Sequence, residues 1–190
     1  QSGGAIDVNA QKIQVKATAK LDVSGDAGGG KIAIGGGGPN TRTQSFTPAV
    51  STTIASGARL DASALTRGDG GEILVFTDLK NPLAFTHVAG SLIARGGTQG
   101  GNGGVVETSG YRLDVSGVVV NTLAPKGRTG LWLLDPANIV IGTEETEGGE
   151  GCNKFGGLSN CSSILNTDLS TRLNTTNVSL EATNSIRVNA

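Results

Sequence analysis

The chain has 190 residues, a formal net charge of −1, 31 glycines, no methionine and only 3% aromatic residues. Hydrophobic residues make up 36% of it, which argues against a domain built around one thick spherical core. The near-neutral charge gives no electrostatic reason to expect nucleic acid or an anionic membrane as partner, and no apolar run approaches the roughly 18 residues that span a bilayer.

Short strands that follow glycines recur along the chain. Each copy begins with a Gly-Gly step, or a single glycine in the last copy, and continues with mostly apolar residues. The copies are Gly3–Val8, Gly29–Ile34, Gly70–Val75, Gly103–Val106 and a looser Thr129–Leu134. Glycine suits a sharp bend because it adopts positive φ without steric cost, so each copy predicts a bend followed by a strand.

A second phrase, Leu-Asp-Val-Ser or Leu-Asp-Ala-Ser, alternates apolar and polar residues. It occurs at Leu21–Ser24, Leu60–Ser63 and Leu113–Ser116, with a weaker version at Leu92–Arg95. Alternation with a period of two predicts strands with one buried face. The residues predicted to point inward are Leu21, Val23, Ile32, Ile34, Leu60, Ile73, Val75, Val105, Leu113 and Val115. Those predicted to face water are Asp22, Ser24, Asp61, Ser63, Asp114 and Ser116.

Self-similarity at a spacing of tens of residues is typical of a solenoid, whose coils bury a thin interior only when they stack. The sequence therefore predicts an all-β fold, a right-handed parallel β-helix, over residues 1–141. A loop is inserted at about residues 36–51, and a disulfide-bearing excursion follows at 142–165. Residues 166–190 are expected to form a short helix and then a further coil.

The most apolar stretch is Leu131–Ile141. Its alternation is expected to place Leu131 and Leu133 inside the fold and Trp132 and Leu134 outside. An apolar outer face needs a cover, which the excursion after it can supply.

Only two cysteines occur, Cys152 and Cys161, close together in that excursion. A local pair in a chain of this composition favours a disulfide in an oxidising compartment over two free thiols in the cytosol. The helix is expected over residues 168–173, with Thr167 or Asp168 as its N-cap. Strand patterning resumes at Val178–Leu180 and Ile186–Val188.

The phrase Gly127–Ile141, read as GRTGLWLLDPANIVI, resembles the G-x-x-G-x-L-L-L-D-P-x-[ND]-I-x-I phrase of filamentous-haemagglutinin-like proteins. These are large exoproteins of two-partner secretion in Gram-negative bacteria. The Gly-Asp-Gly-Gly and Leu-Asp-Val-Ser-Gly phrases are similar to the coil repeats of that family, and the resemblance extends over nearly the whole chain. The family's Asn-Pro-Asn type secretion signature is not found, and Asn81-Pro82-Leu83 matches it only in part.

The resemblance implies an internal β-helical section of a much longer adhesin that mediates attachment to host cells, surfaces or other bacteria. It implies secretion to the bacterial cell surface through an outer-membrane partner transporter of the TpsB type, and a host or bacterial receptor or glycan that the sequence does not name. The expected contact surfaces are the insertions at 36–51 and 142–163. Two alternatives remain: a haem- or host-carrier-protein-binding exoprotein of the same family, and a β-helical enzyme that acts on polysaccharides.

No catalytic, cofactor-binding or metal-binding residue is predicted. Gly25–Lys31 has the spacing of a phosphate-binding loop, but Ile32 follows where that loop needs Ser or Thr. An enzyme would need converging carboxylates, and Asp22, Asp61 and Asp114 are candidates only if they align on neighbouring coils. His87, the only histidine, reads as a surface residue.

Two further motifs belong to recognition and modification. Arg67-Gly68-Asp69 spells an integrin-recognition tripeptide, which also reads as a bend in a glycine-rich chain. N-x-[ST] sequons begin at Asn160, Asn174 and Asn177, and such sequons are possible glycosylation sites in an exported adhesin.

Overall fold

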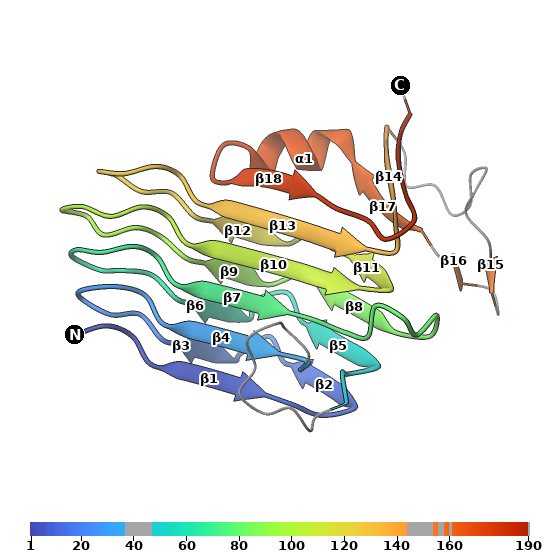
Figure 1. The fold of residues 1–190 in the computed structure, drawn as a ribbon, viewed down its shortest axis with the longest axis horizontal. Helices are drawn as coiled ribbons and strands as arrows, with labels where there is room; N and C mark the ends of the chain where they lie inside the picture. Colours follow the sequence, from blue (N-terminus) through green and yellow to red (C-terminus); the bar gives the residue numbers. More distant parts are fainter. Residues whose placement is uncertain (37–46, 144–153, 156–157, 160, 190) are drawn as a thin grey trace.

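The computed structural model of the protein describes residues 1–36, 47–143, 154–155, 158–159 and 161–189. Among the described residues, strands account for 44% and helix for 4%, so parallel sheets and not helices carry the fold (Figure 1). The prediction of a mostly β protein with parallel strands and one short helix is confirmed.

Six strands stack side by side in the largest sheet, here called sheet A, which faces the viewer in Figure 1. In spatial order they are β1 (Ala5–Val8), β4 (Lys31–Ile34), β7 (Glu72–Val75), β10 (Val105–Gly110), β13 (Leu131–Pro136) and β18 (Asn177–Leu180). Every pair is parallel and in register, so that Ala5 pairs with Lys31, Lys31 with Glu72, and Glu72 with Val105. The strands after the repeated glycines therefore all lie in one sheet, as their shared phrase indicates.

Two further parallel sheets collect the strands between those of sheet A. Sheet B contains β2 (Lys12–Val15), β5 (Ser51–Ile54), β8 (Phe85–Val88) and β11 (Arg112–Asp114). Sheet C contains β3 (Lys20–Asp22), β6 (Arg59–Asp61), β9 (Ser91–Ile93) and β12 (Val119–Asn121). The chain thus visits sheets A, B and C in turn four times, and each visit of all three sheets is called a rung below.

The chain changes this order after β13. A separate parallel sheet has the order β17 (Ser162–Leu165), β14 (Asn138–Gly142) and β19 (Ser185–Val188). The excursion between β14 and β17 contains a short antiparallel pair, β15 (Lys154–Phe155) and β16 (Leu158–Ser159). Strand patterning resumes at β18 and β19, where the sequence predicts it.

The interior is a thin column of aliphatic side chains shared by successive rungs. Along sheet A one inward row contains Ile6, Ile32, Ile73, Val106, Trp132 and Val178. The second inward row contains Val8, Ile34, Val75, Thr108, Leu134 and Leu180. Members in the middle of the stack are fully buried, and those of β1 and β18 are partly buried because no further described strand covers them.

A column of glycines lets the rungs approach closely at the start of each sheet A strand. A Cβ atom on Gly71 would collide with the carbonyl oxygen of Gly30, and one on Gly104 would collide with that of Gly71. A Cβ atom on Gly4 would meet nothing, because Gly4 lies on the outermost rung. Close backbone approach between neighbouring rungs, and not only bending, therefore requires these glycines.

The predicted orientation of the apolar stretch is wrong by one residue. Trp132 and Leu134 point inward and are almost completely buried, whereas Leu131 and Leu133 lie on the outer face. In the same sheet, Val106 and not Val105 is the inward residue, and Val105 is exposed. The register with Ile32 and Ile73 fixes this orientation, and Trp132 Nε1 donates a hydrogen bond to Thr108 Oγ1 at 3.1 Å inside the column.

The single described helix, α1 (Asn166–Arg172), follows β17 directly and lies against the end of the interior beside Val118 and Trp132. Its N-cap is Leu165, without a side-chain hydrogen bond, so the predicted cap at Thr167 or Asp168 is wrong. Asp168 in the first turn and Arg172 in the last turn have the signs that the helix dipole favours. Leu169 packs against the core cluster.

Candidate functional site

Four outward side chains of sheet B form a connected polar and aromatic group on its outer face. Phe85 and His87 extend from β8, and Arg112 and Asp114 extend from the neighbouring strand β11. Alternation places them outside because Thr86 and Leu113, which lie between them in sequence, are buried. The register pairs Phe85 with Arg112 and His87 with Asp114, so the four residues occupy the corners of a rectangle.

Stacking fixes the aromatic half of this group. The Phe85 and His87 rings have centroids 6.3 Å apart and are inclined by only 22°. The Cζ atom of Arg112 lies over the Phe85 ring, 5.2 Å from its centroid, which is cation–π geometry. Arg112 Nη2 also donates a hydrogen bond to the carbonyl of Leu83 at 3.4 Å. Burial lowers the pKa of Arg112, but a guanidinium stays charged at any physiological pH.

A hydrogen bond between His87 and Asp114 fixes the other half. His87 Nδ1 lies 2.9 Å from Asp114 Oδ2, and Asp114 Oδ1 accepts a hydrogen bond from the Ser116 amide at 2.9 Å. Burial acts to raise the pKa of Asp114, but hydrogen bonds from Ser116 and the interaction with His87 outweigh it, so the pKa lies below its usual range. The side chain of His87 remains 30% exposed and that of Asp114 37% exposed, so both are accessible from solvent.

The same outer face continues over the two other strands of sheet B. One row contains Lys12, Ser51, Phe85 and Arg112, and the other contains Gln14, Thr53, His87 and Asp114. At the usual strand spacing of about 4.8 Å, each row is about 14 Å long. These eight residues are called the sheet B face below. It offers hydrogen-bond donors, acceptors and an aromatic ring on one surface.

The described residues add neither a hydroxyl or thiol partner nor a metal-ligand cluster to the His87–Asp114 pair at this face. Among them, Asp114 is the hydrogen-bond partner found for His87, so no hydroxyl or thiol is bound to the imidazole. Within the same described ranges, no group of three or more His, Cys, Asp or Glu side chains is placed to hold a metal ion. The geometry offers recognition groups held in place by one another.

The three aspartates that an enzyme would need do not converge. Asp22 and Asp61 pair on sheet C, whereas Asp114 lies on sheet B, so the third copy of the Leu-Asp-Val-Ser phrase belongs to a different side of the fold. Asp61 and Ser63 were predicted to face water, but both are buried. The strand β6 lies between β3 and β9, so neighbouring rungs cover this part of the chain on both sides.

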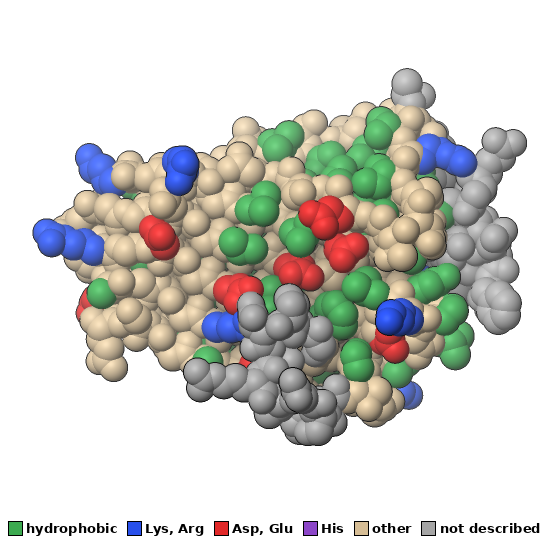
Figure 2. Space-filling view, viewed as in Figure 1, with side chains coloured by type: hydrophobic (Ala, Val, Ile, Leu, Met, Phe, Trp, Pro, Cys, Tyr) green, Lys and Arg blue, Asp and Glu red, His purple; other side chains and the backbone are tan. Residues whose placement is uncertain are grey.

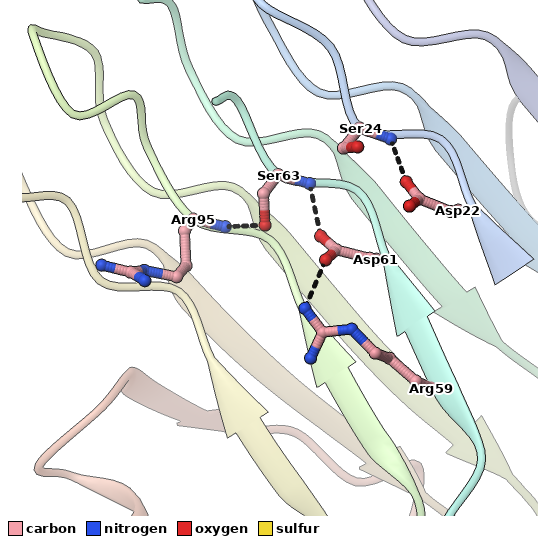
Figure 3. A network of polar contacts seen from close by, with 6 residues as sticks. All are labelled: Asp22, Ser24, Arg59, Asp61, Ser63 and Arg95. Carbon is pink, nitrogen blue, oxygen red and sulfur yellow. Dashed lines mark hydrogen bonds and ion pairs between the residues drawn. The ribbon is translucent and has the colours of Figure 1, made fainter. Parts of the chain in front are cut away.

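Asp22 and Asp61 have a structural role, which Figure 3 shows. Asp22 Oδ1 accepts a hydrogen bond from the Ser24 amide at 2.8 Å, and Asp61 Oδ1 accepts one from the Ser63 amide at 3.0 Å. Hydrogen bonds from the side chain and amide of Ser24 lower the pKa of Asp22. Asp61 Oδ2 also accepts a hydrogen bond from Arg59 Nη2 at 2.6 Å.

The next rungs continue this ladder with other side chains. Ile93 occupies the aspartate position of β9, and there Ser63 Oγ of the preceding rung accepts the Arg95 amide at 3.2 Å (Figure 3). In β12, Asn121 Oδ1 accepts the Leu123 amide at 3.1 Å. The amide at the point where the chain leaves sheet C therefore donates to a side-chain oxygen in every rung, and in the third rung that oxygen comes from the rung before it.

The outer face of sheet A also gathers charge. Figure 2 shows acidic side chains over its middle, beside hydrophobic ones. Lys31 Nζ and Glu72 Oε2 form an ion pair at 2.7 Å across β4 and β7, and Ser109 Oγ donates to Glu107 Oε1 at 2.7 Å. Burial, Glu107 and Glu181 together raise the pKa of Asp135.

The Arg67-Gly68-Asp69 tripeptide lies in a turn that stacks against the turn of the next rung. Arg67 Nε donates to Gln99 Oε1 at 3.1 Å, Gly68 N donates to Gly100 O at 2.9 Å, and Asp69 Oδ1 accepts the Asn102 amide at 2.6 Å. Both charged side chains are exposed, but each is held by the neighbouring turn. Integrin recognition remains a prediction.

Asn174 and Asn177 have different surroundings, while Asn160 lies outside the described residues. Asn174 is exposed after α1, and its Nδ2 donates to Thr171 O at 3.2 Å. Asn177 Nδ2 donates to the carbonyls of Thr129 and Gly130, both at 2.9 Å, and so ties β18 to the start of β13. Glycosylation at these sequons remains a prediction.

Cys161 is disulfide-bonded. Its predicted partner, Cys152, lies outside the described residues, so the Cys152–Cys161 pairing stays a prediction. Most of the two insertions expected to make contacts, residues 37–46 and 144–153, also lie outside the described part.

The sequence could not identify the sheet B face. His87 follows Phe85 by two residues, which places both on one face of a strand, but nothing local connects them to Arg112 and Asp114. The strands β8 and β11 become neighbours only when successive rungs stack, and the number of residues in a rung varies along the chain. The one usable sign was the alternation Phe-Thr-His-Val, typical of a half-buried strand.

No described helix is both long and apolar enough to cross a membrane. No family model matches the chain, and a search of curated proteins found no match.

Proposed function

We propose that the chain is a section of right-handed parallel β-helix that forms a structural and adhesive segment of a large secreted bacterial surface protein. The observation that carries the proposal is the in-register parallel pairing of every third strand from β1 to β13 in sheets A, B and C. A parallel crossover in a sheet is almost always right-handed, which supports the handedness.

A stack of this kind is suited to holding binding groups away from a surface. Its interior is thin, and many backbone hydrogen bonds join each rung to the next, so the stack is stiff along its length without a thick core. Its flat outer faces present side chains at regular spacing. The phrase at Gly127–Ile141 supports secretion by an outer-membrane partner transporter of the TpsB type, with the adhesin as its cargo.

Attachment of coated beads tests the proposal. Beads carrying the purified chain are expected to adhere to cultured epithelial cells or to bacteria more than beads carrying heat-unfolded chain or albumin. Equal adhesion of all three would overturn the adhesive role. Specific capture of haem or one serum carrier protein would favour the binding-exoprotein alternative, and release of reducing sugar from a polysaccharide panel would favour the enzyme.

A further inference from the structure

We propose that the outer face of sheet A joins two copies of this chain about a two-fold axis. The inference goes beyond the proposed function, because it concerns how two copies meet and not what the chain attaches to. Three groups of side chains on one face carry it. They are a basic turn edge (Arg95, Lys126 and Arg128), an apolar strip (Val105, Leu131 and Leu133) and an acidic row (Glu107, Asp135 and Glu181).

The basic turn edge lies where the chain passes from sheet C to sheet A. Arg95 follows β9, and Lys126 and Arg128 follow β12, so all three lie in turns that precede strands of sheet A. All three residues are exposed, and Figure 3 shows the guanidinium of Arg95 directed away from Asp61 and Ser63. The ion pairs formed between described residues include none of the three, so their charges are available to a partner.

The acidic row crosses neighbouring strands of the same face. Glu107 belongs to β10, Asp135 belongs to β13, and Glu181 follows β18. Burial raises the pKa of Asp135, and the charges of Glu107 and Glu181 raise it further. These carboxylates take part in none of the ion pairs that the described residues form, so the chain itself does not neutralise the row.

The apolar strip separates the two charged groups. Val105 pairs with Leu131 at the start of β10 and β13, and Leu133 lies two residues farther along β13. Val105 is 40% exposed, and both leucines are partly exposed. Figure 2 shows Lys and Arg side chains at the edge of this face and a cluster of Asp and Glu side chains farther along it, beside hydrophobic ones. Along the strand direction the order is therefore basic, apolar, acidic.

This order selects a second copy of the chain as the partner. A two-fold axis that passes through the apolar strip and runs across the strands reverses the strand direction, so it places each basic turn edge against the acidic row of the other copy. The same axis packs the two apolar strips against each other. Such an isologous contact uses one surface twice and closes at two copies. A polyanion or a polycation would be attracted by one charged group and repelled by the other, whereas a second copy matches both.

Sedimentation velocity on the whole 190-residue chain tests the inference. In about 20 mM salt, wild type is expected to change from monomer to dimer between about 5 and 500 μM, the range that suits a weak contact. Raising salt to about 500 mM screens exposed charges and is expected to raise the dissociation constant about tenfold or more. These measurements require no substitution, so misfolding cannot account for their result.

Charge reversal on each side of the contact then identifies the surface. One variant combines Lys126→Glu with Arg128→Glu, and the other combines Glu107→Lys with Glu181→Lys. Each alone places like charges opposite each other and is expected to stay monomeric at about 500 μM. An equimolar mixture restores opposite charges at both ends of the contact and is expected to form a one-to-one dimer. The emission of Trp132 and the thermal midpoint show whether each variant is folded.

Lys12→Glu with Lys20→Glu is the matched control, because it changes net charge as much as the first variant but lies on sheets B and C. It is expected to dimerise as wild type does, and loss of its dimer would overturn the inference by assigning association to net charge. The inference is also overturned if wild type stays monomeric at about 500 μM in low salt, if a folded reversed variant dimerises as wild type does, or if the mixture of folded variants does not. Assembly beyond two copies would overturn it as well, because an isologous contact closes.

Discussion

His87 Nδ1 and Asp114 Oδ2 lie 2.9 Å apart and join two neighbouring strands, β8 and β11, whose residues are 27 positions apart in sequence. This contact crosses from one rung to the next on the outer face, where both side chains remain partly exposed. Partly exposed pairs contribute little, so its expected worth is about 0.5 kcal/mol.

Asp114→Asn tests the pH dependence of that contact. The pKa of Asp114 is lowered in the folded protein, so its charge stabilises the fold above the unfolded pKa of about 3.9, and this contribution is lost as pH falls through the folded pKa. Asparagine keeps an oxygen for the Ser116 amide and removes the charge. Urea unfolding at pH 7 and pH 3 is expected to show a smaller loss on acidification for Asp114→Asn than for wild type. An equal loss would assign the acid sensitivity to other carboxylates.

Asp61→Ala is expected to destabilise the protein by about 1–3 kcal/mol, because it leaves the buried Ser63 amide without an acceptor and frees Arg59. Asp22→Ala removes the equivalent bond on the exposed outermost rung and is expected to have a smaller effect. Urea midpoints, read from Trp132 emission, compare the two. Equal losses would mean that burial does not set the strength of these bonds.

The hydrogen bond between Trp132 and Thr108 can be measured with a double-mutant cycle. Thr108→Val leaves the buried indole N–H unpaired and is expected to cost about 1–3 kcal/mol in wild type. In a Trp132→Phe background, the same change removes no partner and is expected to be nearly neutral. Circular dichroism follows unfolding of all four proteins, since two of them lack the tryptophan. Additive effects would exclude this bond as a stabilising contact.

A strand could be assigned to its sheet from the sequence only where a residue type occurs in one sheet and not in the others. The glycines before β4, β7 and β10 mark sheet A, because only glycine fits where neighbouring backbones nearly touch. The Leu-Asp-Val-Ser phrase marks only a strand followed by a turn. Sheets B and C both contain such strands, so Asp114 could not be separated from Asp22 and Asp61.

The sequence could not show which side chains point inward where apolar and polar residues do not alternate. All four residues of Leu131–Leu134 are apolar, so the sequence gives a strand there without showing which pair points inward. Register with Ile73 and Val106 decides it, and that register is a long-range property. The sheet B face was out of reach for the same reason, since its pairs form only when separate rungs stack.

Asp135→Asn is expected to stabilise the protein at neutral pH. Burial and the charges of Glu107 and Glu181 raise the pKa of Asp135, so its ionised form is disfavoured in the folded state. A carboxyl with a raised folded pKa lowers stability as pH rises through that pKa, and asparagine removes this cost. The thermal midpoint at pH 7 is expected to rise by about 1–3 °C, and the difference is expected to vanish near pH 3. A lower midpoint at pH 7 would show that the carboxylate makes a favourable contact.

Gly71→Ala and Gly4→Ala form a matched pair that tests the close stacking of rungs. Both glycines precede a strand of sheet A at the same register position. A methyl group at Gly71 would collide with the backbone of Gly30, and neither backbone can move without breaking the ladder between β4 and β7, so a loss of about 3 kcal/mol or more is expected. A methyl group at Gly4 meets no atom, and Gly4→Ala is expected to be neutral or slightly stabilising because alanine restricts the unfolded chain. Urea unfolding measures the stability of both variants. Equal stability would mean that the backbones of Gly71 and Gly30 are not close enough for a methyl group to collide.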